Sequence, residues 1–73
     1  MTYDLWDLES GNIVNTFGTE REALAVVRTL LELNGLEYAQ SLSLGWEADD
    51  GRLGIVAEGE ALVARATIVR SGV

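Results

Sequence analysis

The chain has 73 residues, of which 48% are apolar, and it contains neither cysteine nor histidine. Its length allows one domain, and the missing residue types exclude disulfide bonds and the usual zinc, haem and iron–sulfur ligand sets. Twelve acidic residues against five arginines and no lysine give a formal net charge of −7, which argues against binding to nucleic-acid phosphates or to anionic lipid.

The first expected unit is a β-hairpin over residues 3–17. Residues 3–8 (YDLWDL) and 13–17 (IVNTF) combine aromatic, aliphatic and β-branched residues, which favour strands. Between these runs lies a dense group of turn residues, in which Gly11 supplies a positive φ.

A helix is expected over residues 19–34. Thr19 and Glu22 have the spacing of a capping box, in which the hydroxyl accepts from the amide of residue 22 and the carboxylate reaches back to the amide of residue 19. The apolar positions then fall on one half of a helical wheel: Ala23, Leu24, Val26, Val27, Leu30, Leu31 and Leu33. At the end of the helix we expect Gly35 in the left-handed region, with Leu36 folded back on Leu31.

The second expected hairpin spans residues 41–57. From residue 41 to 47 the apolar residues recur with a period of two, which predicts a half-buried strand. The run Ala48-Asp49-Asp50-Gly51 is typical of a hairpin turn, and residues 52–57 (RLGIVA) return as a fourth strand. Residues 36–40 are compatible with a strand, a turn or a short helix.

The last segment mixes two propensities. Residues 61–66 favour a helix, and Glu58 and Glu60 suit its N-terminus. The run from Thr67 to Val69 is β-branched and resists helix formation. We therefore expect a helix over about residues 59–66 and a frayed or extended tail over residues 67–73.

These elements predict a single α+β domain over residues 1–73 with the order β-β-α-β-β-α. Because both hairpins are local, the fold is expected to contain one four-stranded antiparallel sheet with both helices packed on one face. The two halves share the hairpin–helix order, which is compatible with a pseudo-repeat. The second face of such a sheet stays open.

No group of residues indicates catalysis or metal binding. Glu47, Asp49 and Asp50 lack the alternating ligand spacing of a calcium loop. The acidic residues of the first hairpin, Asp4, Asp7 and Glu9, are interleaved with apolar residues, which is typical of surface charges. No histidine or lysine is present to activate a serine. We expect a protein that is not an enzyme and binds no metal or cofactor.

The aromatic residues are the candidate interface: Tyr3, Trp6, Tyr38 and Trp46. Aromatic side chains on a sheet can stack nucleic-acid bases, but the scattered arginines and the negative charge argue against that role. A core or homodimer position is the alternative. A small domain without disulfides or metals depends on tight packing or on self-association, so we expect a homodimer.

The run from Leu5 to Leu31, with its W-D-x-x-S-G-N turn and T-E-x-E-A-L helix start, resembles the N-terminal hairpin–helix of small uncharacterised bacterial proteins. A fainter likeness is to HicB-type antitoxins, in which a T-x-x-E-A-L run follows a sheet. The glycine and proline turn of that family is missing here. These motifs are a turn and a helix cap, so the resemblance implies no functional residue.

The expected function is a non-enzymatic protein-interaction or regulatory module. One alternative is an antitoxin or inhibitor whose acidic face covers a basic nuclease or DNA-binding protein. Another is a small-ligand-binding domain that uses the sheet face. No signal-peptide pattern and no apolar run of about 20 residues is present, so we expect a cytoplasmic protein that does not enter a membrane.

Overall fold

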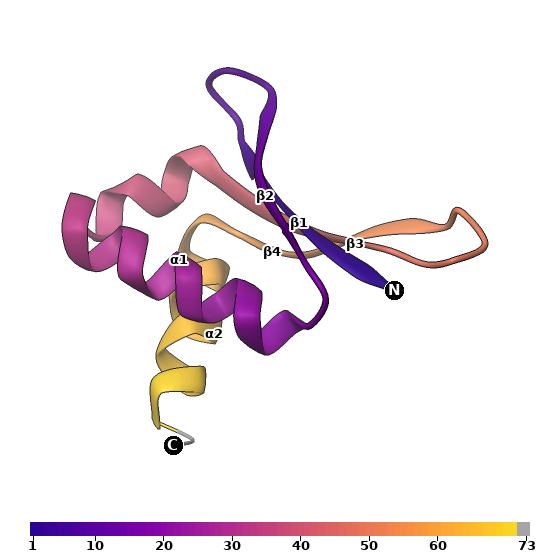
Figure 1. Ribbon diagram of the computed structural model, residues 1–73. Helices are drawn as coiled ribbons and strands as arrows, with labels where there is room; N and C mark the ends of the chain where they lie inside the picture. Colours follow the sequence, from indigo (N-terminus) through magenta and orange to yellow (C-terminus); the bar gives the residue numbers. More distant parts are fainter. Residues whose placement is uncertain (72–73) are drawn as a thin grey trace.

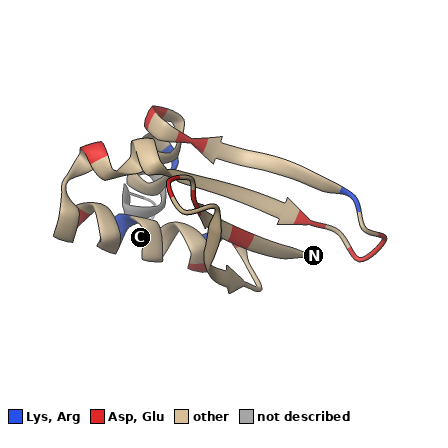
Figure 2. Ribbon diagram, turned by 90° about the horizontal axis from the view of Figure 1, so that it is seen from above, with Lys and Arg blue, Asp and Glu red and all other residues tan. Residues whose placement is uncertain are grey.

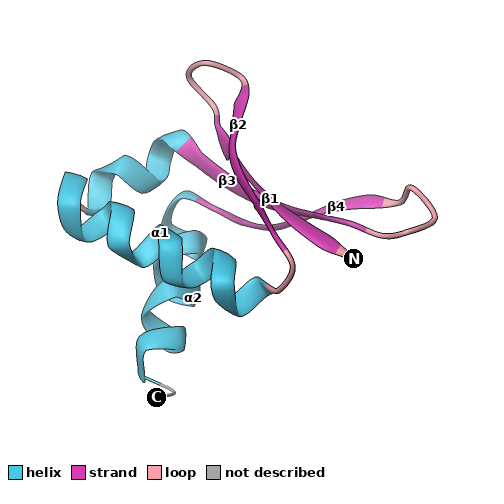
Figure 3. Cartoon of the chain, in the orientation of Figure 1, coloured by secondary structure: helices cyan, strands magenta, loops and turns pink. Residues whose placement is uncertain are grey.

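The computed structural model describes residues 1–71, with side chains described through residue 67. The elements follow one another as two hairpin–helix units joined by a short 3₁₀ helix (Figure 3). Their bounds are β1 Thr2–Asp7, β2 Asn12–Phe17, α1 Glu20–Asn34, η1 Leu36–Ser41, β3 Leu42–Glu47, β4 Leu53–Glu58 and α2 Gly59–Ser71. The predicted α+β order is confirmed, with η1 as an addition.

The four strands form one antiparallel sheet in the order β2-β1-β3-β4. The two hairpins meet through β1 and β3, where Leu5 lies directly opposite Leu44. Helix α1 contacts β1 and β2, and α2 contacts β3 and β4. Both helices lie on the same side of the sheet, as predicted, and the β3–β4 hairpin extends away from them (Figure 1).

The two halves are related by a local twofold arrangement. Each hairpin carries a register shift at one place: after Leu5 in the β1–β2 pair and after Leu44 in the β3–β4 pair. A half-turn about an axis through the Leu5–Leu44 pair exchanges β1 with β3 and brings Trp6 onto Gly45. The pseudo-repeat thus exists in the arrangement of the strands, although the side chains at equivalent positions differ.

The hydrophobic core lies between the sheet and the two helices. Leu5, Leu42, Leu44 and Leu62 are fully buried there. Around them pack the other buried residues of this cluster: Phe17, Ala23, Leu24, Val27, Leu31, Ala39, Ala57 and Ala66. Burial of apolar area on this scale is the main favourable term available to a chain without covalent cross-links.

The start of α1 follows the predicted cap in part. The Glu22 amide donates to Thr19 Oγ1 at 3.1 Å, as a capping box requires. The Thr19 hydroxyl in turn donates to Glu22 Oε1 at 3.2 Å, so the carboxylate meets the hydroxyl rather than the backbone amide of Thr19. The helix begins at Glu20 because Thr19 has extended backbone angles.

The end of α1 differs from the predicted Schellman stop. Gly35 has the expected positive φ of 92°, but its ψ of 156° turns the chain outward. Its amide still donates to the Leu31 carbonyl at 2.8 Å, and its own carbonyl accepts from Tyr38 at the start of η1. Of the open alternatives for residues 36–40, the short helix is the one that forms.

The predicted tail is wrong where the structure describes it. Helix α2 continues to Ser71, five residues past the expected end at Ala66. Thr67 is accommodated because its hydroxyl donates to the Val63 carbonyl one turn earlier, at 3.0 Å, a bond that threonine makes inside helices. Residues 72–73 of the predicted tail lie outside the described part of the chain.

Removing the contact at the centre of the sheet should destabilise the whole domain. We expect Leu5→Ala to lower the free energy of unfolding by about 3 kcal/mol, because it leaves a cavity that the surrounding side chains fill only in part. Urea denaturation monitored by circular dichroism measures this change. Leu33→Ala is the matched control, since Leu33 is 76% exposed and should change stability by less than about 0.5 kcal/mol.

The helix cap gives a second stability test. Thr19→Ala should lower the free energy of unfolding by about 1 kcal/mol, because the Glu22 amide loses its acceptor. Thr29→Ala is the control. The Thr29 hydroxyl donates to the Ala25 carbonyl inside the helix, so its removal leaves every amide at the helix start with its acceptor. Equal destabilisation by the two substitutions in chemical denaturation would contradict this role for Thr19.

Candidate functional site

The sheet face away from the helices carries exposed apolar side chains from three strands. We call it the open face and define it by Asp4, Trp6, Ile13, Glu47, Leu53 and Ile55. Directly opposed residues in an antiparallel pair point to the same side, and Trp6 is opposite Ile13 while Glu47 is opposite Leu53. Ile55 and Leu53 are 61% and 71% exposed, and Trp6 and Ile13 are 36% and 46% exposed. Such a contiguous apolar group marks a contact surface more often than scattered exposed residues do.

A hollow of about 250 Å³ lies in the open face, with Gly45 among its lining residues. Gly45 stands between Asp4 of β1 and Ile55 of β4. A Cβ atom at this position would lie 3.0 Å from the Gly54 carbonyl oxygen and 3.9 Å from Ile55 Cδ1. Glycine in a central strand weakens a sheet and commonly marks a close approach. Gly45 is itself buried, so its backbone forms the floor of the hollow between Trp6 and Ile55.

A second glycine accommodates the ring of Trp46. Gly54 is directly opposite Trp46, and a Cβ on Gly54 would lie 2.3 Å from Trp46 Nε1. That separation is far below a van der Waals contact, so the indole position depends on glycine at residue 54. Trp46 and Gly54 also line the hollow.

The charged side chains that line the hollow are both acidic. They are Asp4 and Glu47, and among the described residues no arginine lines it. Asp4 Oδ1 accepts a hydrogen bond of 2.9 Å from the Thr16 hydroxyl, which fixes the carboxylate beside the hollow. Figure 2 shows acidic segments on both hairpins and both helices, against few basic ones.

Three of the arginines pair with carboxylates away from the hollow. Arg28 pairs with Glu32, Arg52 with Asp50 and Arg65 with Glu20, at 2.9 to 3.2 Å. None of the ion pairs within the described residues includes Asp4 or Glu47. The rim of the hollow therefore keeps its negative charge.

The four aromatic residues predicted as an interface do not share one surface. Tyr3 and Tyr38 are half-buried and pack against the core. Trp46 is opposite Tyr3 across the β1–β3 pair, so it stands on the helix side of the strand, near its end. Trp6 alone belongs to the open face. Trp46 also contributes to the lining of the open-face hollow, although its partner across the strand pair is on the helix side.

The carboxylates weighed as catalytic or metal-binding groups lie apart. Asp7 Oδ1 accepts from the Glu9 amide within the first turn. Asp50 binds the Arg52 guanidinium, and Asp49 pairs with the N-terminal ammonium. Among the described residues, no group of three acidic side chains is placed to hold a metal ion.

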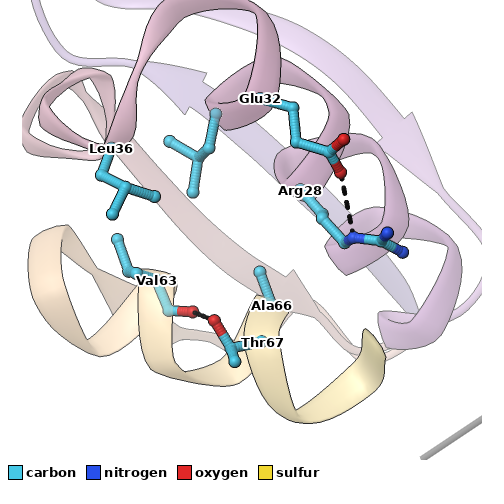
Figure 4. Close-up of a pocket in the computed structure, with 7 residues that line it drawn as sticks. Arg28, Glu32, Leu36, Val63, Ala66 and Thr67 are labelled. Carbon is cyan, nitrogen blue, oxygen red and sulfur yellow. Dashed lines mark hydrogen bonds and ion pairs between the residues drawn. The ribbon is translucent and has the colours of Figure 1, made fainter. Parts of the chain in front are cut away.

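A different cleft lies between α1 and α2. Its walls are Leu31, Leu36, Val63, Ala66 and Thr67, with the Arg28–Glu32 pair at one side (Figure 4). Arg28 Nε is 3.0 Å from Glu32 Oε1, but the contact lacks hydrogen-bond geometry and is an ion pair only. The cleft has a volume of about 100 Å³.

Neither hollow has the size of a typical small-molecule site. Ligand pockets in proteins span roughly 300–1,000 Å³, whereas the open-face hollow has 250 Å³ and the inter-helix cleft 100 Å³. A third depression, between η1 and α2, measures 280 Å³ and is lined partly by Glu37 and Glu60. These dimensions suit the contact of one side chain from a partner better than a whole metabolite.

Sequence reasoning missed most of the open face. The sequence places Ile13, Leu53 and Ile55 in strands without indicating that they share a face, and it assigns Gly45 no role. The one available signal was the pair of glycines at 45 and 54, because glycine is unfavourable inside strands. The faces themselves depend on the two register shifts, which no local pattern indicates.

The packing of Trp46 on Gly54 can be tested by fluorescence. In a Trp6→Phe background, where Trp46 is the remaining tryptophan, Gly54→Ala should move the emission maximum to longer wavelength because the added methyl displaces the ring toward water. Gly18→Ala is the control, since nothing lies within 4 Å of a Cβ placed there. An unchanged spectrum for Gly54→Ala would show that the ring does not sit on residue 54.

No helix among the described residues is long and apolar enough to cross a membrane. Comparisons with protein-family models, with curated proteins and with solved structures find no match to this chain. The resemblances noted in the sequence therefore stay predictions, and the open face is the feature from which a function is inferred.

Proposed function

We propose that this chain is a non-enzymatic protein-interaction or regulatory module that binds a partner protein through its open face. The observation that carries the proposal is the apolar group of Trp6, Ile13, Leu53 and Ile55 on a sheet face that no described helix covers. Exposed apolar area of this kind is unfavourable in water, and a partner that covers it removes that cost.

The composition of the face supports this use. Aromatic and aliphatic side chains line the hollow together with the carboxylates of Asp4 and Glu47. Protein interfaces commonly combine aromatic and aliphatic contact side chains with polar groups.

An inhibitor of the antitoxin type is a more specific candidate. It would use the open face to cover a basic site on a nuclease or a DNA-binding protein. The net charge of −7 and the carboxylates of Asp4 and Glu47 beside the hollow favour it. A partner of this class would associate quickly at low ionic strength and dissociate as salt is added.

Site-specific photocrosslinking in cells tests the proposed surface. With p-benzoylphenylalanine at Ile55, we expect a discrete crosslinked band of defined mass. The same group at Leu33, which is at least as exposed as Ile55 but lies on α1, should give none. The mass of the band separates a crosslinked second copy from a different protein. Equal crosslinking at the two positions, or none at Ile55, would remove the open face as the binding surface.

A further inference from the structure

We infer that the open face takes a basic partner segment: one apolar side chain of the partner seats over Gly45, and cations beside it pair with Asp4 and Glu47. The inference rests on the proposed function and specifies the chemistry of the partner. It follows from the dimensions of the hollow, the charge of its rim and the consequences of symmetry for a second copy.

The hollow has room for one anchor side chain. Its 250 Å³ corresponds to about eight water molecules at ~30 Å³ each. The floor is backbone at Gly45, and the walls are apolar at Trp6 and Ile55. An apolar side chain in such a hollow displaces poorly bound water and meets apolar atoms on two sides, which is how anchor residues act at interfaces.

The rim determines which segment can carry that anchor. Asp4 is directly opposite Gly45 on β1, and Glu47 is two residues along β3 on the same face. Both carboxylates thus stand within one or two residues of the anchor position, and no ion pair of the described residues engages either one. A partner with acidic residues flanking its anchor would be repelled, whereas arginine or lysine would be attracted.

The same charges argue against a second copy as the occupant, although a homodimer was the expectation from sequence. In a twofold contact each surface meets itself. Contact between two open faces would bring together two surfaces that each carry the Asp4 and Glu47 carboxylates, with no arginine among the described lining residues to offset their repulsion. Added salt would then strengthen self-association, but it would weaken binding to a basic partner.

The experiment is a titration of the ¹⁵N-labelled full chain, followed by amide and indole resonances. The probes are short synthetic peptides of equal length: one with leucine between two arginines, one with leucine between two glutamates, and one with glycine between two arginines. We expect the first peptide to give saturable shifts at Gly45 and at the Trp6 indole, weakened in about 0.5 M NaCl. The other two should bind at least several-fold more weakly.

Charge variants locate the recognition. Glu47→Gln should weaken the leucine–arginine peptide by roughly two- to fivefold, as for one exposed ion pair. Glu37→Gln changes the net charge equally but lies on η1, away from the open face, and should have no effect. If both variants weaken binding equally, the attraction is only that of the overall charge, and the assignment to Asp4 and Glu47 is wrong.

The remaining outcomes separate this inference from the proposed function. If the glutamate peptide shifts the same open-face resonances as strongly, the face binds partners but not basic ones, and the inference fails alone. If raising the protein concentration and the salt concentration broadens those resonances without any peptide, the occupant is a second copy. If no peptide perturbs the open face and crosslinking from Ile55 is also absent, the proposed function falls with the inference.

Discussion

The fold depends on the pairing of β1 with β3. Each hairpin is local and closes by its own turn, but an isolated hairpin is at best marginally stable in water. Only the β1–β3 pair joins the two into a sheet wide enough to support helices, and its centre is the buried contact of Leu5 with Leu44. Because each helix follows its hairpin directly, both arrive on the same side. Within the described residues no further element lies on the other side, so the open face follows from the topology of these elements.

The local elements were predictable because their signals are local. Gly11 and Gly51 both adopt the positive φ that a hairpin turn requires. The helical period of α1 identified its buried residues Ala23, Leu24, Val27 and Leu31, but Leu33, which the same pattern includes, is exposed. The strand order could not be predicted from local sequence patterns, because it depends on contacts between residues almost 40 positions apart. The extent of α2 was misjudged because β-branched residues count against a helix locally, whereas packing of Leu62 and Ala66 on the core supports it.

The candidate site was less predictable than the fold, for a related reason. Which residues share a face in neighbouring strands depends on the register. At each register shift one strand has an extra residue, so its later residues point to the opposite face from the one that simple alternation predicts. Aromatic residues are typical of interfaces, yet Tyr3 and Tyr38 pack against the core. The hollow instead contains Gly45, which has no side chain. The effect of a glycine at this position depends on its neighbours across the sheet, which the sequence does not indicate.

An exposed apolar face on a small domain also carries a risk of aggregation. Leu53 and Ile55 belong to an edge strand, whose backbone groups are available to other strands. Carboxylates next to such a surface make contact between identical copies costly while leaving contact with a basic molecule favourable. The same carboxylates thus oppose aggregation of the protein and favour the basic partner that we propose.

The local twofold relation explains how such an asymmetric site can occur in a nearly symmetric sheet. The half-turn that exchanges β1 and β3 places Trp6 on Gly45: one equivalent position holds the largest side chain and the other holds none. Two separate hairpin–helix chains of identical sequence, assembled around the same axis, would carry either two tryptophans or two glycines there. Covalent linkage of the halves lets the two positions diverge, so that one supplies a wall and the other a floor. A cavity with one tryptophan wall and one glycine floor can therefore form in a single linked chain, but not in a symmetric assembly of two identical halves.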